Sequence, residues 1–223
     1  MSDPIVIVGA GQASASCAAK LRALGYDGPL VIIGEETAAP YQRPPLSKKY
    51  VSGELALERL FVRPLTWYAE EKIDLRLGSR VAAIHPAAQE IELGDGSRLK
   101  YRDLVLTTGS RPRRLPAAIG GDLAGVYTVR DLADADAIAP TLKPGAKLLV
   151  IGGGYIGLEA AAVAAQKGLK VTVIEMADRI LQRVAAAPTS DFFRDLHQSR
   201  GGTIREKTGL AKLVGEGGRL TGA

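Results

Sequence analysis

The sequence predicts an α/β fold built on two parallel sheets, and three observations support this prediction. Apolar strands at residues 5–8 and 148–151 each run into a glycine-rich turn followed by an alanine-rich helix. Each helix leads to another apolar strand, at residues 30–33 and 170–174. A carboxylate follows each of these second strands. Strand, glycine turn, helix, strand and acid in this order are typical of a Rossmann-like dinucleotide-binding domain, so we expect two such domains.

The second glycine turn has the full G-x-G-x-x-G spacing. Gly152 makes the tight turn, Gly154 allows a pyrophosphate to approach the backbone, and Gly157 lets the helix pack against the strand. Tyr155 and Ile156 open the helix, whose unpaired N–H groups then face the phosphates. This turn therefore predicts a site for the pyrophosphate of a dinucleotide.

Glu175 ends the second strand of this unit and is the candidate ribose ligand. Its carboxylate would accept hydrogen bonds from a 2'-hydroxyl and repel a 2'-phosphate, which favours NAD over NADP. Arg179 and Arg183 follow closely and weaken that preference. The alternative is a tightly turned βαβ unit that binds no ligand.

The first glycine turn is a variant of the same pattern, G-x-G-x-x-S, with Gly9, Gly11 and Ser14. Ser14 adds a small side chain where helix meets strand, and a modest shift of the helix can absorb it. Glu35 is the ribose candidate of this unit, with Glu36 as the alternative. Two dinucleotide sites in one chain imply a flavin and a nicotinamide, so we expect FAD in the first and NADH in the second.

Length and composition argue against a membrane-spanning, a disulfide-bonded or a zinc-binding protein. A length of 223 residues gives room for two domains, and no apolar run approaches the roughly 20 residues that span a bilayer. The first strand begins almost at once, which leaves no room for a signal peptide. Cys17 is the single cysteine, and there are two histidines, which disfavours a disulfide or a structural zinc site and makes the cytoplasm the simplest compartment.

The net charge is +5, and the basic residues are scattered rather than clustered, apart from Arg111, Arg113 and Arg114. Scattering argues against a nucleic-acid surface. A solvated basic surface and a docking face for an acidic electron carrier both remain open.

Between the two units, alternating strands at residues 81–84, 90–93 and 98–101 surround a Gly-Asp-Gly turn, which predicts an antiparallel meander. Trp67 and Tyr68 are expected in a core helix. We interpret His85 and His197 as structural rather than catalytic.

Three stretches resemble one known family. Residues 43–48 read Arg-Pro-Pro-Leu-Ser-Lys, residues 152–159 read Gly-Gly-Gly-Tyr-Ile-Gly-Leu-Glu, and residues 106–113 contain Thr-Thr-Gly-Ser-Arg-Pro-Arg. They are similar to the FAD-dependent pyridine nucleotide oxidoreductases, and among these to the ferredoxin reductases of bacterial cytochrome P450 and ring-hydroxylating dioxygenase systems.

The resemblance implies the following site residues. Arg43 and Lys48 would lie along the flavin, and the backbone near Val81 would meet the adenine. Thr108, Gly109 and Arg113 belong to the stretch that closes the first FAD segment and are further candidate cofactor contacts.

The resemblance also implies a catalytic group. Lys48 would pair with Glu159 beside the flavin ring, shielded from water, and Tyr155 would cover the flavin where nicotinamide enters. Without the resemblance, Glu159 is an ordinary first-turn acid that complements the helix dipole, and Tyr155 is a packing residue.

In the fold that the resemblance implies, a meander replaces the crossover helix, giving three-layer ββα domains whose parallel sheets each carry an antiparallel meander. Residues 1–110 would be the first segment of the FAD-binding domain, and residues 111–223 an NAD-binding domain truncated at its C-terminal end. Family members run further, so a second FAD segment and a C-terminal interface domain would be absent. We therefore expect this chain alone to bind FAD poorly and to be inactive.

Residues 41–51 contain no cysteine, so electrons would have no thiol relay and would leave the flavin singly. The function expected is an NADH-dependent reductase of a [2Fe-2S] ferredoxin. Reduction of rubredoxin, monodehydroascorbate or another acceptor remains an alternative, as does an NADH-sensing binding protein similar to apoptosis-inducing factor. The sequence leaves the acceptor and the oligomeric state open.

Overall fold

The computed structural model describes residues 3–223, which form two compact units. The first unit contains the residues up to Arg43 together with Ala56–Arg111. The second contains Pro44–Leu55 and Pro112–Ala223. Part of the Arg43 to Lys48 motif, from the first half of the sequence, thus folds with the second glycine turn. No helix in the described part of the chain is long and apolar enough to cross a membrane.

The first unit is built on a four-stranded parallel sheet in the order β3-β2-β1-β7. Its strands are β1 (Ile5–Val8), β2 (Leu30–Ile33), β3 (Ile73–Arg76) and β7 (Asp103–Leu106). β1 and β2 consist entirely of buried apolar residues, because both faces of this parallel sheet are covered. The strands predicted at residues 5–8 and 30–33 are confirmed, whereas β3 and β7 were not predicted.

Two helices cover one face of this sheet: α1 (Gln12–Ala23) and α2 (Leu65–Glu70). Gly25 lies just past α1 with a φ of 84°, the left-handed conformation expected at a helix end. The core beneath the helices consists of Ile5, Ile7, Ala18, Leu30, Ile32, Tyr68 and Ile73.

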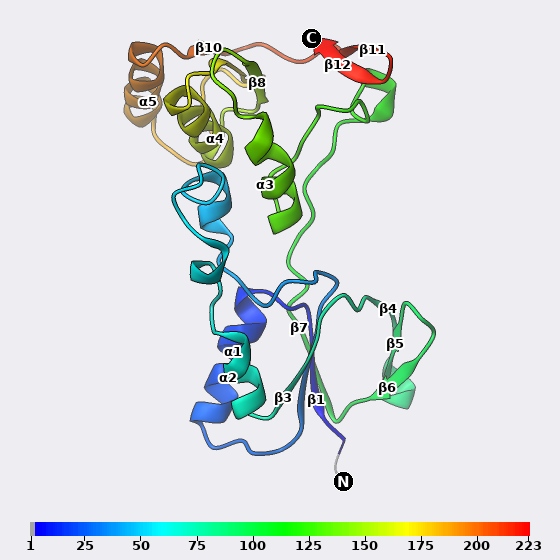
Figure 1. The fold of residues 1–223 in the computed structure, drawn as a ribbon. Coiled ribbons are helices and arrows are strands. Elements are labelled where there is room, and N and C mark those ends of the chain that lie inside the picture. The colour runs from blue at the N-terminus through cyan, green and yellow to red at the C-terminus, as the bar shows by residue number, and fades with distance from the viewer. Residues whose placement is uncertain (1–2) are drawn as a thin grey trace. The chain divides into compact units, whose positions relative to one another are not determined.

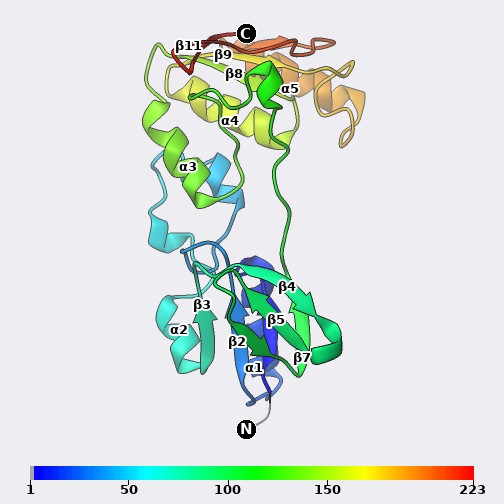
Figure 2. The ribbon, with the colours of Figure 1, turned by 90° about the vertical axis from the view of Figure 1, so that its right-hand side faces the viewer.

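An antiparallel meander covers the opposite face. Its strands are β4 (Val81–His85), β5 (Glu90–Leu93) and β6 (Arg98–Lys100). Figure 1 shows the meander and the helices on opposite sides of the sheet, and in Figure 2 the meander faces the viewer. The core between the two sheets contains Val6, Val8, Val31, Ile33, Ile91, Leu93 and Tyr101. The three-layer prediction is therefore confirmed for this unit, with the meander on the connection from β3 to β7.

Tyr68 gives a test of this packing. Its side chain is 2% exposed, and its hydroxyl is the one buried side-chain polar atom without a hydrogen-bond partner among the described residues. Burial raises the pKa of Tyr68 to about 12. We expect Tyr68→Phe to raise the free energy of unfolding by about 1 kcal/mol, because it removes an unpaired buried polar group.

Tyr41→Phe is the matched control, measured in the same urea titrations. Tyr41 is equally buried, but its hydroxyl donates to Glu36 Oε2 at 2.5 Å. Its removal should lower the free energy of unfolding by about 2 kcal/mol, since the acceptor is charged. Changes of the same sign in both variants would contradict this interpretation.

The second unit has a three-stranded parallel sheet in the order β10-β9-β8. The strands are β8 (Lys147–Ile151), β9 (Lys170–Ile174) and β10 (Thr203–Arg205), and the helices are α3 (Leu132–Ile138), α4 (Tyr155–Gln166) and α5 (Ala187–Ser199). Its antiparallel part is the two-stranded pair β11 (Val214–Glu216) and β12 (Arg219–Gly222). Single 3-10 turns occupy Pro44–Ser47, Leu57–Arg59, Pro86–Ala88, Ala117–Ile119 and Ala139–Thr141.

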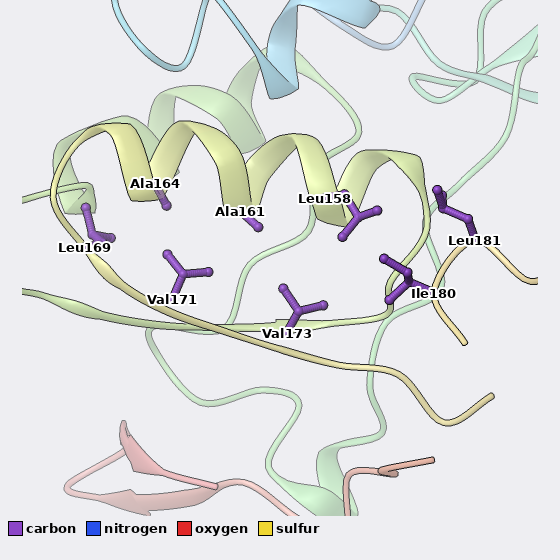
Figure 3. Packing of buried hydrophobic residues seen from close by; sticks show 8 residues of the cluster. All are labelled: Leu158, Ala161, Ala164, Leu169, Val171, Val173, Ile180 and Leu181. Atoms are coloured by element: carbon purple, nitrogen blue, oxygen red, sulfur yellow. The ribbon is translucent and has the colours of Figure 1, made fainter. Parts of the chain in front are cut away.

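α4 packs on this sheet through small and branched side chains. Figure 3 shows Leu158, Ala161 and Ala164 on the side of the helix that faces Val171 and Val173 of β9. The two alanines let the helix approach the strand closely, and the loop after β9 completes this core with Ile180 and Leu181. The helix predicted to begin at Tyr155 and the strand predicted at residues 170–174 are both confirmed.

Candidate dinucleotide sites

The second glycine turn is shaped by contacts that only glycine allows. Gly152 has a φ of +106°, and a Cβ on Gly157 would lie 2.2 Å from the carbonyl oxygen of Gly152. By contrast, a Cβ on Gly152 or Gly154 would meet no protein atom within 4 Å. The backbone at the start of α4 thus borders open space, and a pyrophosphate fits there without displacing protein atoms.

Glu175 is fixed beside this turn. Its Oε2 accepts a hydrogen bond from the backbone N–H of Gly153 at 2.8 Å, and its Oε1 accepts one from Ala177 at 2.8 Å. Each carboxylate oxygen can accept a further hydrogen bond, so the group is oriented and still able to bind hydroxyls. This is the arrangement expected of a ribose ligand.

The second unit contains a cavity of about 1330 Å³ at this turn. Tyr155 and Ile156 line it and are each 55% exposed. Its wall also includes Gly152, Gly154, Glu175 and Arg179. The cavity brings the predicted nicotinamide-dinucleotide residues together in one place, and its volume suits an elongated ligand.

Lys48 and Glu159 form an ion pair, with 2.7 Å between Lys48 Nζ and Glu159 Oε2. Ser47 Oγ donates to the same carboxylate oxygen at 2.6 Å, a contact that the sequence analysis missed. The interpretation of Glu159 as a first-turn acid is wrong, because the first turn of α4 holds no acidic residue. In this structure the Lys48 and Glu159 side chains are 46% and 30% exposed.

The segment that carries Lys48 is attached to the second unit at another point. Tyr50 Oη donates to Asp136 Oδ1 of α3 at 2.7 Å. Together with the Glu159 contacts, this bond fixes the segment to two helices of that unit. The Lys48–Glu159 pair is thus a feature of the second unit alone.

The first glycine turn accommodates its serine by a local hydrogen bond. Ser14 is fully buried and its Oγ donates to the carbonyl oxygen of Gly11 at 2.7 Å. Gly9 has a φ of +106°, and a Cβ there would lie 2.3 Å from the carbonyl oxygen of Thr107, whereas a Cβ on Gly11 would meet nothing within 4 Å. This turn also leaves its backbone open to a pyrophosphate.

The two acids after β2 have different surroundings. Glu36 accepts hydrogen bonds from Tyr41 and from Arg43, with which it forms an ion pair. The Glu35 side chain is 62% exposed and lies 3.9 Å from the guanidinium groups of Arg80 and Arg111. Glu35 is therefore the more available ribose ligand. Arg43 was predicted to contact flavin, and in this structure its guanidinium pairs with Glu36.

The remaining candidates stay predictions. Thr108 and Gly109 follow β7 and are exposed, and Thr108 N lies 3.0 Å from the position of a Cβ on Gly9. Val81 opens β4 and is half-buried. Arg113 is exposed and folds with the second unit rather than the first.

Neither histidine belongs to a catalytic cluster in the described residues. His85 Nε2 lies 3.0 Å from Glu92 Oε2 on the meander. Burial lowers the pKa of His197, which lies on α5. No group of three or more His, Cys, Asp and Glu residues within 3–223 is placed to hold a metal ion.

Two units that each combine an open glycine turn, a helix and an acid after the second strand define an α/β protein with two candidate dinucleotide sites. Residues 3–222 match the family described as pyridine nucleotide-disulphide oxidoreductase. The chain belongs to this family.

Several relatives are similar to the chain. A ferredoxin--NAD(P)(+) reductase of a Sphingomonas species is 46% identical over 217 residues, which is 97% of this chain and 52% of the relative. Putidaredoxin reductase of Pseudomonas putida is 43% identical over 209 residues, 93% of this chain and 50% of the relative. The chain thus spans about half the length of the curated relatives it matches.

Solved structures agree with the sequence comparison. The covalent complex of putidaredoxin reductase with putidaredoxin matches with a TM-score of 0.95 and 40% identity, over 99% of this chain and 54% of that one. A ferredoxin reductase of Rhodopseudomonas palustris matches with a TM-score of 0.94 and 34% identity, over 99% and 54%.

Proposed function

We propose that the protein is an NADH-dependent FAD oxidoreductase that passes electrons singly to a [2Fe-2S] ferredoxin serving a monooxygenase or dioxygenase. The observation that carries the proposal is the pair of open glycine turns in one chain, each followed by a carboxylate. The names of the relatives, ferredoxin and putidaredoxin reductases, support the acceptor class. The single cysteine supports a cytoplasmic location.

The residues present suit these cofactors. Gly11 and the backbone N–H groups at the start of α1 would hold the FAD pyrophosphate, with Glu35 on its ribose, while the buried Ser14 fixes the turn through its hydrogen bond to Gly11. Gly154 and Glu175 would hold NADH in the same way in the second unit. Bound FAD would supply the conversion between a hydride, which brings two electrons, and an iron–sulfur carrier, which accepts one.

The Lys48–Glu159 pair would act electrostatically. Its carboxylate lies on the second turn of α4, two residues after Gly157 of the second glycine turn. Ser47 fixes the carboxylate by a short hydrogen bond. Placed at the flavin edge, a fixed charge pair would tune the electron affinity of the ring, and Tyr155 would cover the nicotinamide entrance.

The test is an anaerobic titration of the complete native protein, supplied with FAD, in which NADH or NADPH is added and the flavin absorbance is followed. We expect bleaching by NADH at much lower concentration than by NADPH. Reoxidation by a [2Fe-2S] ferredoxin from the same source should follow with two ferredoxins reduced per NADH. Absence of NADH-dependent bleaching would overturn the proposal. Bleaching followed by reoxidation only by another acceptor, such as rubredoxin, would change the acceptor class.

Glu175→Gln tests the cofactor preference. We expect the Kd for NADH to rise about tenfold, because hydrogen bonds to a charged acceptor are worth roughly 1.5–3 kcal/mol and a neutral amide replaces it. The Kd for NADPH should fall, since the charge that repels the 2'-phosphate is gone. Calorimetric titration of both dinucleotides measures this, and an unchanged ratio of the two Kd values would show that Glu175 does not contact the ribose.

A further inference from the structure

We propose that Ser190 is a specificity-determining residue: it holds Arg179 away from the ribose end of the second dinucleotide site, so that Glu175 sets the preference against a 2'-phosphate. The inference rests on the proposed NADH site. Without such a restraint, an arginine four residues after the ribose acid would offset the charge of that acid.

Arg179 is tied by two hydrogen bonds. Its Nη1 donates to Ser190 Oγ at 2.6 Å, and its Nη2 donates to the carbonyl oxygen of Gln182 at 3.3 Å. Both acceptors are neutral, so the guanidinium is oriented without being neutralised. Its charge remains available to any anion that it can reach once released.

Ser190 is itself fixed. It is fully buried in the first turn of α5, and its hydroxyl donates to the carbonyl oxygen of Ile180 at 2.6 Å. A serine hydroxyl has one proton to donate, so its free lone pairs can only accept, and Arg179 supplies the donor. The hydroxyl therefore joins Arg179 to the backbone of its own loop.

This tether lies at the candidate site. Arg179 and Glu175 line the same cavity, on the loop that follows β9. A released guanidinium would either pair with Glu175 and neutralise it, or contact a 2'-phosphate directly. Both outcomes strengthen NADPH binding relative to NADH binding.

Arg183 is the internal comparison. It lines the same cavity, is exposed, and makes no ion pair among the described residues. Of the two arginines that follow Glu175, the structure thus restrains only Arg179.

The experiment measures the Kd of NADH and of NADPH by calorimetry for the complete native protein and its variants. We expect the wild-type chain to prefer NADH, and S190A to reduce that preference about five- to tenfold, the range of a partly exposed charge-assisted contact. S190T keeps the hydroxyl and should keep the wild-type preference. A general loosening of the loop would weaken the binding of both dinucleotides equally and leave the ratio of their Kd values unchanged.

Two second-site substitutions show which arginine changes the cofactor preference when Ser190 is replaced. In the S190A background, R179Q should restore the wild-type preference, whereas R183Q should leave it reduced. As a single change, R179Q should alter the NADPH Kd less than twofold, because the cation is already withdrawn. A larger loss of NADPH binding in R179Q would overturn the inference.

Failure of the inference and failure of the proposed function give different results. If the wild-type chain binds NADH and S190A leaves the preference within twofold, the tether does not set specificity, and the NADH site stands. If the complete native protein binds neither dinucleotide while remaining folded, both are overturned.

Discussion

Gly9→Ala is expected to lower the free energy of unfolding by about 3 kcal/mol or more. Gly9 has a φ of +106°, which costs an L-residue roughly 1–2 kcal/mol. The added Cβ would also lie 2.3 Å from the carbonyl oxygen of Thr107, a backbone atom that cannot turn away. Relieving this contact must separate β1 from β7, which pair in parallel through the same region. Overpacking of this kind costs a further 1–3 kcal/mol, in rough terms.

Gly11→Ala is the control in the same turn. Gly11 has an extended backbone, with a φ of −113°, and open space where its Cβ would stand. We expect a loss of about 1 kcal/mol at most, since Gly11 is the N-cap of α1 and alanine caps poorly. Urea unfolding followed by circular dichroism distinguishes the two variants. Equal losses would mean that the Thr107 contact does not determine the need for glycine at position 9.

The variants Gly9→Ala and Gly11→Ala also distinguish an effect on folding from an effect on FAD binding. Under the proposed function, Gly11→Ala places a methyl group where the pyrophosphate approaches, so FAD affinity should fall although the fold is retained. Gly9→Ala should reduce FAD affinity only through the loss of folded protein. The two glycines of one motif thus have different physical roles.

Sequence reasoning succeeded where the signal is local. The strand at residues 5–8, the helix after the first glycine turn and the strand at residues 170–174 were predicted, because the apolar pattern, the glycine turn and the alanine-rich run agree within one short stretch. The meander was predicted from its alternating residues and its turn. The Lys48–Glu159 pair was predicted from resemblance alone, because the two residues are 111 positions apart and no local pattern connects them.

The contacts that sequence reasoning missed all depend on tertiary structure. Ser47 donates a hydrogen bond to Glu159, Arg43 forms an ion pair with Glu36, and Ser190 accepts a hydrogen bond from Arg179. Serine in a helix or turn is ordinary in composition, so nothing in the sequence marks Ser47 or Ser190 as a partner of a charged group. Their roles follow from the side chains that folding brings to them.

Glu206→Ala is expected to lower the free energy of unfolding by about 3 kcal/mol, because Glu206 joins three elements of the second unit. Its Oε1 accepts from the backbone N–H of Ile180 at 2.8 Å, and its two oxygens accept from Arg194 Nη2 and Nε at 2.9 and 3.0 Å. These bonds raise the pKa of Arg194. Alanine would leave the N–H of the fully buried Ile180 unpaired and a partly exposed guanidinium without its main partner.

Asp191→Ala removes a different carboxylate from the same arginine. Asp191 Oδ1 lies 2.8 Å from Arg194 Nη1, but its side chain is 60% exposed, so we expect a loss of at most about 0.5 kcal/mol. A double-mutant cycle with Arg194→Ala should give a large coupling energy for Glu206 and a small one for Asp191. Similar small losses for both acids would show that the bond to Ile180 contributes little. Ile180 precedes Leu181, whose N–H donates to the carbonyl oxygen of Gly153 at 2.9 Å. A large loss of stability in Glu206→Ala would therefore also mean that Glu206 fixes the loop that contacts the second glycine turn.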